Sequence, residues 1–310
     1  MKTMKVSLVI GLAMVLASTA SAISIDWASI DLQYVEFKLV SWDMSTIYSS
    51  PASTAGIAGV NALSQNQYAS ANGTYYTTSG GTCTVNDPYR EDGWGIFRVT
   101  EIIDKRTGEA YWQGGSSGEE IYGIYYGKID NAVLSGTNSY DVQSQGVQID
   151  FYLNSAGTFA AAGGAMQGSA GRTAFDEYNG ISGGQLLMST YSLQSGKDAL
   201  LGVGNNEFQE HWNTTGPNAG TGDYISRLRL TGGLWYDDLY TGYVNGDLEM
   251  AGHSYLNETE YGGTPIGDWT TRSQDPITPI IPPAIPEPLT MLGVGLGLMG
   301  LGSYIRRRMS

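Results

Sequence analysis

The alternation of apolar and polar residues constrains the fold of this chain more than any other feature of the sequence. Every second residue of 147–153 is apolar, and Gln148, Asp150 and Tyr152 lie between the apolar positions. A period of two predicts a strand with one buried face. The same alternation covers 35–39 and 227–230, and further β-rich runs occupy 96–103, 121–129, 234–244 and 247–250.

Clusters of Gly, Asn, Ser and Asp separate these runs, as expected for tight turns. They lie at 114–118, 179–180, 182–184 and 245–246. Many short strands with such turns, and no long segment of helical period, predict an all-β domain that forms a β-sandwich or jelly roll. Residues 160–171 are rich in Ala and Gly, and the sequence leaves open whether they form a short helix or a loop.

The single cysteine, Cys83, rules out an internal disulfide. The domain must therefore be stabilised by its hydrophobic core, and the chain is long enough to bury a large one.

The two ends of the chain have a different character from the middle. A short basic start with Lys2 and Lys5 precedes an apolar run at 6–17, and small residues at Ala20 and Ala22 suit a signal peptidase site. We therefore expect residues 1–22 to be a signal peptide that directs export.

The C-terminal tail has three parts in a fixed order. Pro286, Glu287 and Pro288 precede seventeen uncharged residues at 289–305, and a basic stop follows, made of Arg306, Arg307 and Arg308. Seventeen helical residues rise about 26 Å, near the lower limit for crossing a bilayer core. Arginines that follow such a span stay cytoplasmic, so everything before Pro286 should lie outside. An ordinary C-terminal anchor is the alternative.

This tail resembles the PEP-CTERM sorting signal of Gram-negative bacteria that secrete extracellular polysaccharide. The resemblance implies that the chain is a substrate of exosortase, a membrane transpeptidase that cuts at or beside residues 286–288. It also implies release to the cell surface or extracellular matrix, in association with exopolysaccharide and biofilm. A block at 91–95, with 119–120, 122–127 and Asp130, is similar to a segment of other proteins with this tail, and implies no activity.

These ends define the expected organisation of the chain. Residues 23–272 form the exported all-β domain, 273–285 form a Pro-rich spacer, and 286–310 form the sorting signal. The partners are signal peptidase and exosortase during export, the inner membrane transiently, and extracellular polysaccharide afterwards.

The charge balance excludes one class of partner. The chain has 16 basic and 30 acidic residues and a formal net charge of −14, and five of the basic residues lie in the two ends. So acidic a domain repels nucleic acid, and no nucleic-acid partner is expected.

Three groups of residues are candidates for chemistry. Glu207 and Glu210, beside His211 and Trp212, resemble an acid/base pair next to a sugar-stacking ring, as in glycoside hydrolysis. Two glutamates near a Trp are also expected by chance in so acidic a chain. The favoured interpretation has no catalytic residue and no enzyme activity, and the alternative is a secreted glycan-active enzyme of sandwich fold.

The second group consists of acidic residues around a predicted hairpin with Asn245 and Gly246 at its turn. Carboxylates gathered by a turn repel one another unless a hard cation such as calcium bridges them. Solvated surface acids are the alternative. The four carboxylates are Asp237, Asp238, Asp247 and Glu249.

The third group is aromatic. Rings in one strand region form either a platform that stacks on sugars or a packed core. The residues are Trp235, Tyr236, Tyr240 and Tyr243. Together these patterns predict an exported, acidic, all-β surface protein that is structural or binds glycan.

Overall fold

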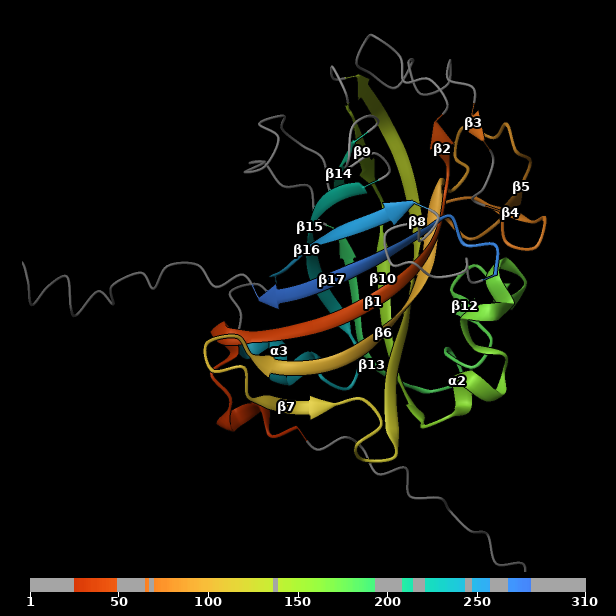
Figure 1. Ribbon diagram of the computed structural model, residues 1–310. Coiled ribbons are helices and arrows are strands. Elements are labelled where there is room, and N and C mark those ends of the chain that lie inside the picture. Colours follow the sequence, from red (N-terminus) through yellow and green to blue (C-terminus); the bar gives the residue numbers. More distant parts are fainter. Residues whose placement is uncertain are drawn as a thin grey trace, which may run out of the picture.

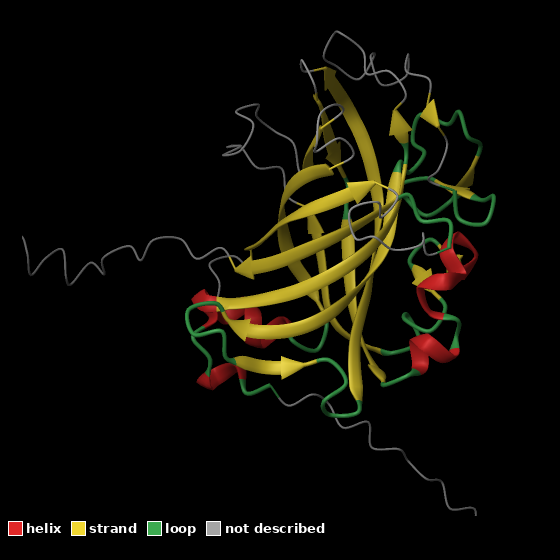
Figure 2. Ribbon diagram, viewed as in Figure 1, coloured by secondary structure: helices red, strands yellow, loops and turns green. Residues whose placement is uncertain are grey.

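The structure, a computed structural model, describes residues 25–48, 65–66, 70–135, 139–192, 208–213, 221–242, 247–256 and 267–279. Most of these residues form one antiparallel sheet (Figures 1 and 2). Its strands are β1 (Val35–Ser45), β6 (Gly93–Asp104), β7 (Ala110–Gln113), β8 (Glu119–Ser135), β9 (Ser139–Gln145), β10 (Gln148–Ser155), β13 (Gln185–Ser192), β14 (Phe208–Asn213), β15 (Thr221–Gly232), β16 (Asp247–Leu256) and β17 (Thr271–Pro279).

The sheet closes on itself. Pairings lead from β1 through β6, β8, β10, β13, β15, β16 and β17, and β17 pairs with β1 again. The long strands β8 and β15 extend beyond β10 and β13. In that extension β8 pairs with β9, β9 with β14, and β14 with β15, so β9 and β14 take the places of β10 and β13 at the other end of the cylinder.

The prediction of an all-β domain is confirmed, but the connections differ from those of a jelly roll. Each strand of the cylinder pairs with the next one along the chain, whereas a jelly roll is built from Greek keys. The alternating pattern identifies strands and their buried faces, but it does not identify which strands are neighbours.

The interior is filled by apolar side chains that the alternation identified. Ile149, Phe151 and Leu153 of β10 point inward and pack with Phe37 and Phe97. This confirms the predicted strand at 147–153.

One end of the cylinder is closed by short helices. These are η1 (Trp27–Ser29), η2 (Leu32–Tyr34) and α3 (Tyr236–Gly242). Trp27 and Trp235 meet edge to face with ring centroids 5.2 Å apart, and Leu239 is fully buried beside them.

A compact cover packs on the outer face of β6 and β8 (Figure 2). It resolves the open question at 160–171, because the segment includes α2 (Thr158–Ala161) and η3 (Gly164–Gly171), followed by β11 (Arg172–Ala174) and β12 (Glu177–Tyr178). Trp94, Ile124 and Tyr178 are buried beneath it. That part of the sheet is therefore buried on both faces.

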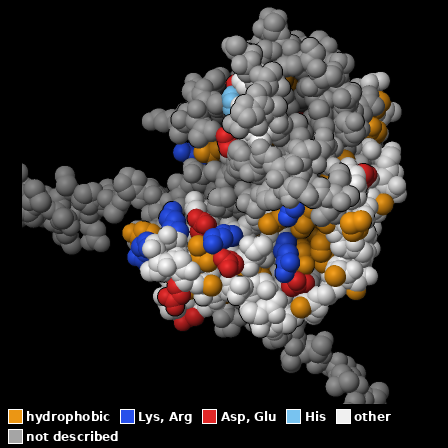
Figure 3. Space-filling view, viewed as in Figure 1, with side chains coloured by type: hydrophobic (Ala, Val, Ile, Leu, Met, Phe, Trp, Pro, Cys, Tyr) orange, Lys and Arg blue, Asp and Glu red, His pale blue; other side chains and the backbone are white. Residues whose placement is uncertain are grey.

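Elsewhere the outer face of the sheet carries mixed charges. Basic and acidic side chains lie side by side on the face shown in Figure 3. Ion pairs join β1 to β6 and β6 to β8, with Lys38 Nζ 3.0 Å from Glu101 and Arg98 Nη2 3.0 Å from Glu120. Two further strand pairs are β2 (Ile47–Tyr48) with β3 (Gln65–Asn66), and β4 (Tyr75–Tyr76) with β5 (Thr82–Cys83).

The β-rich run at 234–244 was wrongly assigned, because α3 occupies Tyr236–Gly242. Trp235 and Leu239 are four residues apart and both buried, which is the spacing of one helical face. Asp237 and Asp238 lie in the first turn, where carboxylates favour a helix N-terminus. The hairpin on which the calcium prediction rested is therefore absent at 236–242.

The domain also extends further than expected. β17 ends at Pro279, so the sheet includes seven residues that the sequence analysis assigned to the spacer beginning at 273. The pairing of β17 with β16 is interrupted around Pro276, since Met250 pairs with Ile277 and His253 with Gln274 but no pair lies between them. Proline lacks the N–H that a ladder needs, which explains the interruption.

The turn at 114–118 is confirmed, since it connects β7 to β8 with Gly115 and Gly118 at positive φ. Residues 1–22 and 286–310 lie outside the described residues. In the part of the chain that is described, no helix has the length and apolar character needed to cross a membrane.

Candidate functional site

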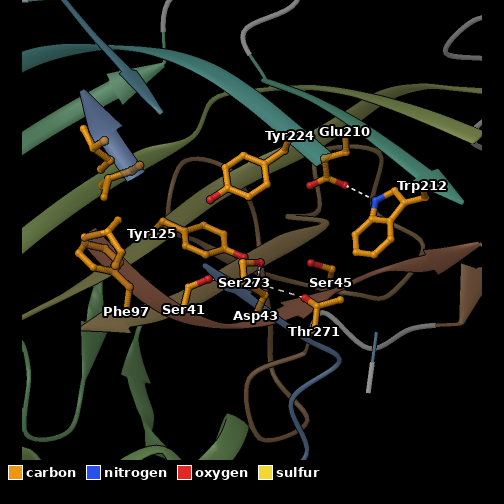
Figure 4. Close-up of a pocket in the computed structure, with 13 residues that line it drawn as sticks. Ser41, Asp43, Ser45, Phe97, Tyr125, Glu210, Trp212, Tyr224, Thr271 and Ser273 are labelled. Carbon is orange, nitrogen blue, oxygen red and sulfur yellow. Dashed lines mark hydrogen bonds between the residues drawn. The ribbon is translucent and has the colours of Figure 1, made fainter. Parts of the chain in front are cut away.

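The interior changes from apolar to polar along the cylinder. Along β1 the inward positions change from Leu39 to Ser41 and Asp43, and along β17 they change from Ile277 to Ser273. A cavity of about 40 Å³ lies at this boundary. Its polar and aromatic lining includes Asp43, Tyr125, Glu210, Trp212, Tyr224 and Thr271 (Figure 4).

Asp43 is the most deeply buried acid of the cavity, with 6% of its surface exposed. Its Oδ2 accepts hydrogen bonds from Ser273 Oγ at 2.9 Å and Thr271 Oγ1 at 3.2 Å, and Ser41 Oγ lies 3.4 Å away. Its Oδ1 accepts no hydrogen bond from the described residues. Burial raises the pKa of Asp43 to about 6, although the nearby hydroxyls of Tyr125 and the three residues above oppose this shift.

A glycine makes room for this carboxylate. Gly95 of β6 pairs with Asp43, and a Cβ at Gly95 would lie 2.8 Å from Asp43 Oδ1 and 2.5 Å from Tyr125 Cε1. Any larger residue would displace the acid or the tyrosine ring.

Glu210, a predicted catalytic candidate, lines the same cavity, but each of its carboxylate oxygens already accepts a hydrogen bond. Its Oε1 accepts a hydrogen bond from Lys128 Nζ at 2.6 Å, and its Oε2 accepts one from Trp212 Nε1 at 3.0 Å. Burial alone would lower the pKa of Lys128, but the carboxylates of Asp130 and Glu210 raise it above its usual value.

An irregularity in β8 brings Lys128 to this position. Gly93 pairs with Lys128 but Gly95 pairs with Tyr125, so β8 has one extra residue here. Gly127 has a φ of +79° at this point. The extra residue lets Tyr125 and Lys128 both face the interior.

Of the predicted group around Glu210, the structure describes Glu210, His211 and Trp212. His211 is next to Glu210 in β14, so its side chain points to the opposite face, where Nδ1 lies 2.5 Å from Asp141 Oδ1. Glu207 lies outside the described residues. The cavity has room for about three water molecules, which excludes a sugar ring.

A second group of buried charges lies between the sheet and its cover. Arg172 donates two hydrogen bonds to Glu91, at 2.6 and 3.1 Å, and its guanidinium lies 4.5 Å from the Trp94 ring centroid. Burial raises the pKa of Glu91, and Arg172 opposes the rise.

Asp92 is held next to this pair. Arg90 Nη2 donates to Asp92 Oδ1 at 2.7 Å, and the Asp130 N–H donates to Oδ2 at 3.0 Å. Burial and then the charge of Asp130 raise the pKa of Asp92 to about 6. The block at 91–95 noted in the sequence is therefore a buried structural junction, with Trp94 in the core under the cover.

An open groove of about 580 Å³ lies on the outer face of β8, β10 and β13. Gln148 pairs with Tyr126 on one side and with Tyr191 on the other. Asp150 borders the groove and accepts hydrogen bonds from Ser189 Oγ at 2.5 Å and Tyr126 Oη at 2.8 Å. None of the described residues that line the groove is basic. This groove was not predicted, because its residues come from four strands, β8, β10, β13 and β15, and from the turn before β10.

The structure describes three of the four residues of the predicted aromatic platform. Trp235 is 2% exposed and belongs to the core that closes the cylinder. Tyr236 and Tyr240 stack on each other along α3, with centroids 5.0 Å apart. Tyr243 lies outside the described residues.

The calcium prediction stays untested. Asp237 and Asp238 lie in α3 and Asp247 and Glu249 in β16, while the segment between these elements is not described. In the described part of the chain, no group of three or more His, Cys, Asp or Glu side chains is arranged to hold a metal ion.

No known family model, curated protein or solved structure matches this chain.

Proposed function

We propose that this chain is an exported surface or extracellular-matrix protein that binds a neutral polysaccharide in the groove of β8, β10 and β13. The groove carries the proposal. It combines the exposed ring of Tyr191 with amide, hydroxyl and carboxylate groups, a lining that suits a polyhydroxylated sugar ring.

Tyr191 offers the accessible ring of the groove, with 38% of its surface exposed, and it pairs with Gln148 of β10. Tyr126, on the other side of Gln148, is 7% exposed and packs on Phe175, so it contributes its hydroxyl and not its ring face. The absence of a basic residue from the described lining favours a neutral polymer, since the acidic domain repels anionic ones.

Binding is tested by affinity electrophoresis of the full chain, solubilised in non-ionic detergent, through gels that contain dextran, hydroxyethylcellulose or alginate. We expect retardation by a neutral polymer and none by anionic alginate. Tyr191→Ala should lose the retardation. Tyr240→Ala is the matched control, because Tyr240 is 39% exposed and Tyr191 is 38% exposed. Equal behaviour of the two variants, or no retardation of the wild type, contradicts the proposal.

The location of the protein follows from its tail. The resemblance of 286–310 to a sorting signal supports exosortase cleavage at or beside Glu287, after export directed by residues 1–22. Proline disfavours helical backbone at the residue before it, so a Pro-Glu-Pro sequence suits a cleavage site placed just ahead of a membrane-spanning run.

Replacing Glu287 by Ala leaves the apolar run unchanged and should block processing, so the full tail should persist in membrane fractions. Processing of the Glu287→Ala protein at the wild-type rate would leave the tail as a simple anchor.

We do not extend the proposal to glycan hydrolysis. Both oxygens of Glu210 are engaged, and the cavity beside it has no room for a sugar.

A further inference from the structure

The polar end of the interior holds more carboxylates than cations. Lys128 lies 2.6 Å from Glu210 and 3.5 Å from Asp130, and Arg90 lies 2.7 Å from Asp92. Among the described residues, these cations leave Asp43 without an ion-pair partner. The excess of buried negative charge is therefore centred on Asp43.

The free oxygen of Asp43 is unusual for a buried group. Three hydroxyls gather around Oδ2, while Oδ1 accepts no hydrogen bond from any described residue. A buried carboxylate without a cation or a full set of donors is strongly disfavoured. The hydroxyl of Tyr125 also hydrogen-bonds the Asp43 side chain, so what the described residues do not supply is a cationic partner for this acid and a donor to its Oδ1.

The cavity beside Asp43 has the shape and lining for such a donor. It measures about 40 Å³ and is walled by the rings of Tyr125, Trp212 and Tyr224, with Phe97 and Ile149 on its apolar side. Aromatic rings attract a cation through their faces, and the attraction is strongest where water is excluded.

We propose that this cavity binds a small ammonium cation, either the ammonium ion or a short primary alkylammonium, with an N–H group directed at Asp43 Oδ1. The alkyl part of the ligand lies against Phe97 and Ile149. This inference depends neither on the glycan groove nor on the sorting signal.

The available oxygens favour ammonium over a hard metal ion. Calcium takes six to eight oxygen ligands. Here both oxygens of Glu210 are already occupied, and the hydroxyls of Ser273 and Thr271 donate to Asp43 Oδ2. One carboxylate oxygen with three aromatic rings matches the needs of an N–H donor.

Thermal unfolding at pH 7.5 tests the proposal on the full chain in non-ionic detergent, with ionic strength kept constant by sodium chloride. Methylammonium and ammonium chloride should raise the melting temperature by about 3–6 °C for each tenfold excess over Kd. Tetramethylammonium has no N–H group and should have no effect.

Asp43→Asn should abolish the response. Asp150→Asn is the matched control, because Asp150 is also buried and bonded by hydroxyls but faces the outer groove. A response to ionic strength alone, or an Asp43→Asn protein that responds as the wild type does, overturns the proposal.

Nitrogen-15 NMR provides a test that needs no variant. Labelled ammonium bound in the wild type should give a proton signal protected from exchange, with cross-peaks to aromatic protons. Loss of that signal in Asp43→Asn supports the assignment, and its absence from the wild type overturns the proposal.

Discussion

Glu91 and Asp43 are both buried carboxylates, but they lie in different surroundings. Glu91 lies between the sheet and its cover, where Arg172 binds both of its oxygens and the Gly127 N–H adds a third hydrogen bond at 2.6 Å. Asp43 lies inside the cylinder with hydroxyl partners only, and one of its oxygens is unused by the described residues.

Because of this difference, the two buried carboxylates have different roles, one in stabilising the fold and one in binding a ligand. A carboxylate whose partners are all supplied by the chain holds two parts of the fold together. A carboxylate whose partners are incomplete lowers the stability of the empty protein, and the loss is recovered when something binds. Asp43 therefore identifies a binding site, and Glu91 a structural joint.

Removing the partner of Glu91 should have the largest effect. Arg172→Met leaves a buried carboxylate unpaired and should lower the free energy of unfolding by about 3–5 kcal/mol. The measurement is urea denaturation at pH 7.5. The double variant Glu91→Gln, Arg172→Met carries no unpaired charge and should recover most of the loss. A single variant as stable as wild type would show that the ion pair of Glu91 and Arg172 does not stabilise the fold.

Replacing Asp43 should raise the free energy of unfolding, whereas replacing Arg172 should lower it. Its pKa rises from 3.8 unfolded to about 6 folded, so the folded state binds more protons between these values and stability falls as pH rises through this window. In ammonium-free buffer, Asp43→Asn should therefore be more stable than wild type by about 3 kcal/mol at pH 8 and nearly equal to it at pH 4.

Denaturation curves across pH 4–8 measure this difference. Asp92, whose pKa is also raised to about 6, should leave a similar fall with pH in the variant. A variant less stable than wild type at pH 8 would show that Asp43 is structural, as Glu91 is.

The smallest effect concerns the hydroxyls around Asp43. Ser273→Ala removes the 2.9 Å hydrogen bond to Oδ2 and should cost about 1.5 kcal/mol at pH 8, where Asp43 is ionised. The cost should shrink at pH 4, where the carboxyl is protonated. A cost that is equal at both pH values would assign the loss to packing.

Part of this structure is predictable from local sequence. The alternation at 147–153 identifies β10 and its buried face because both depend only on neighbouring residues. The α3 helix was missed because Tyr and Trp also favour strands, and only the burial of Trp235 and Leu239 reveals the helical face.

The site itself depends on contacts that sequence patterns do not contain. Arg172 and Glu91 are 81 residues apart, and Asp43 and Ser273 are 230 apart. One local signal for the cavity does exist. On the inward face of β1, the apolar positions of 35–39 give way to Ser41 and Asp43, which marks the point where the interior becomes polar.

Closure of the sheet by β1 and β17 has a consequence for the export proposed above. These strands pair although Trp42 and Arg272 are 230 positions apart, so the first strand to leave a translocation channel waits for the last. Contacts between such distant residues form slowly and leave sheet edges unpaired in the meantime. In that proposal the cylinder can close only after Pro279 has left the channel, shortly before the apolar run at 289–305 would reach the membrane. Proposed export would thus make folding and arrival at the membrane nearly simultaneous, and a chaperone that shields the open edge of β1 would act during that interval.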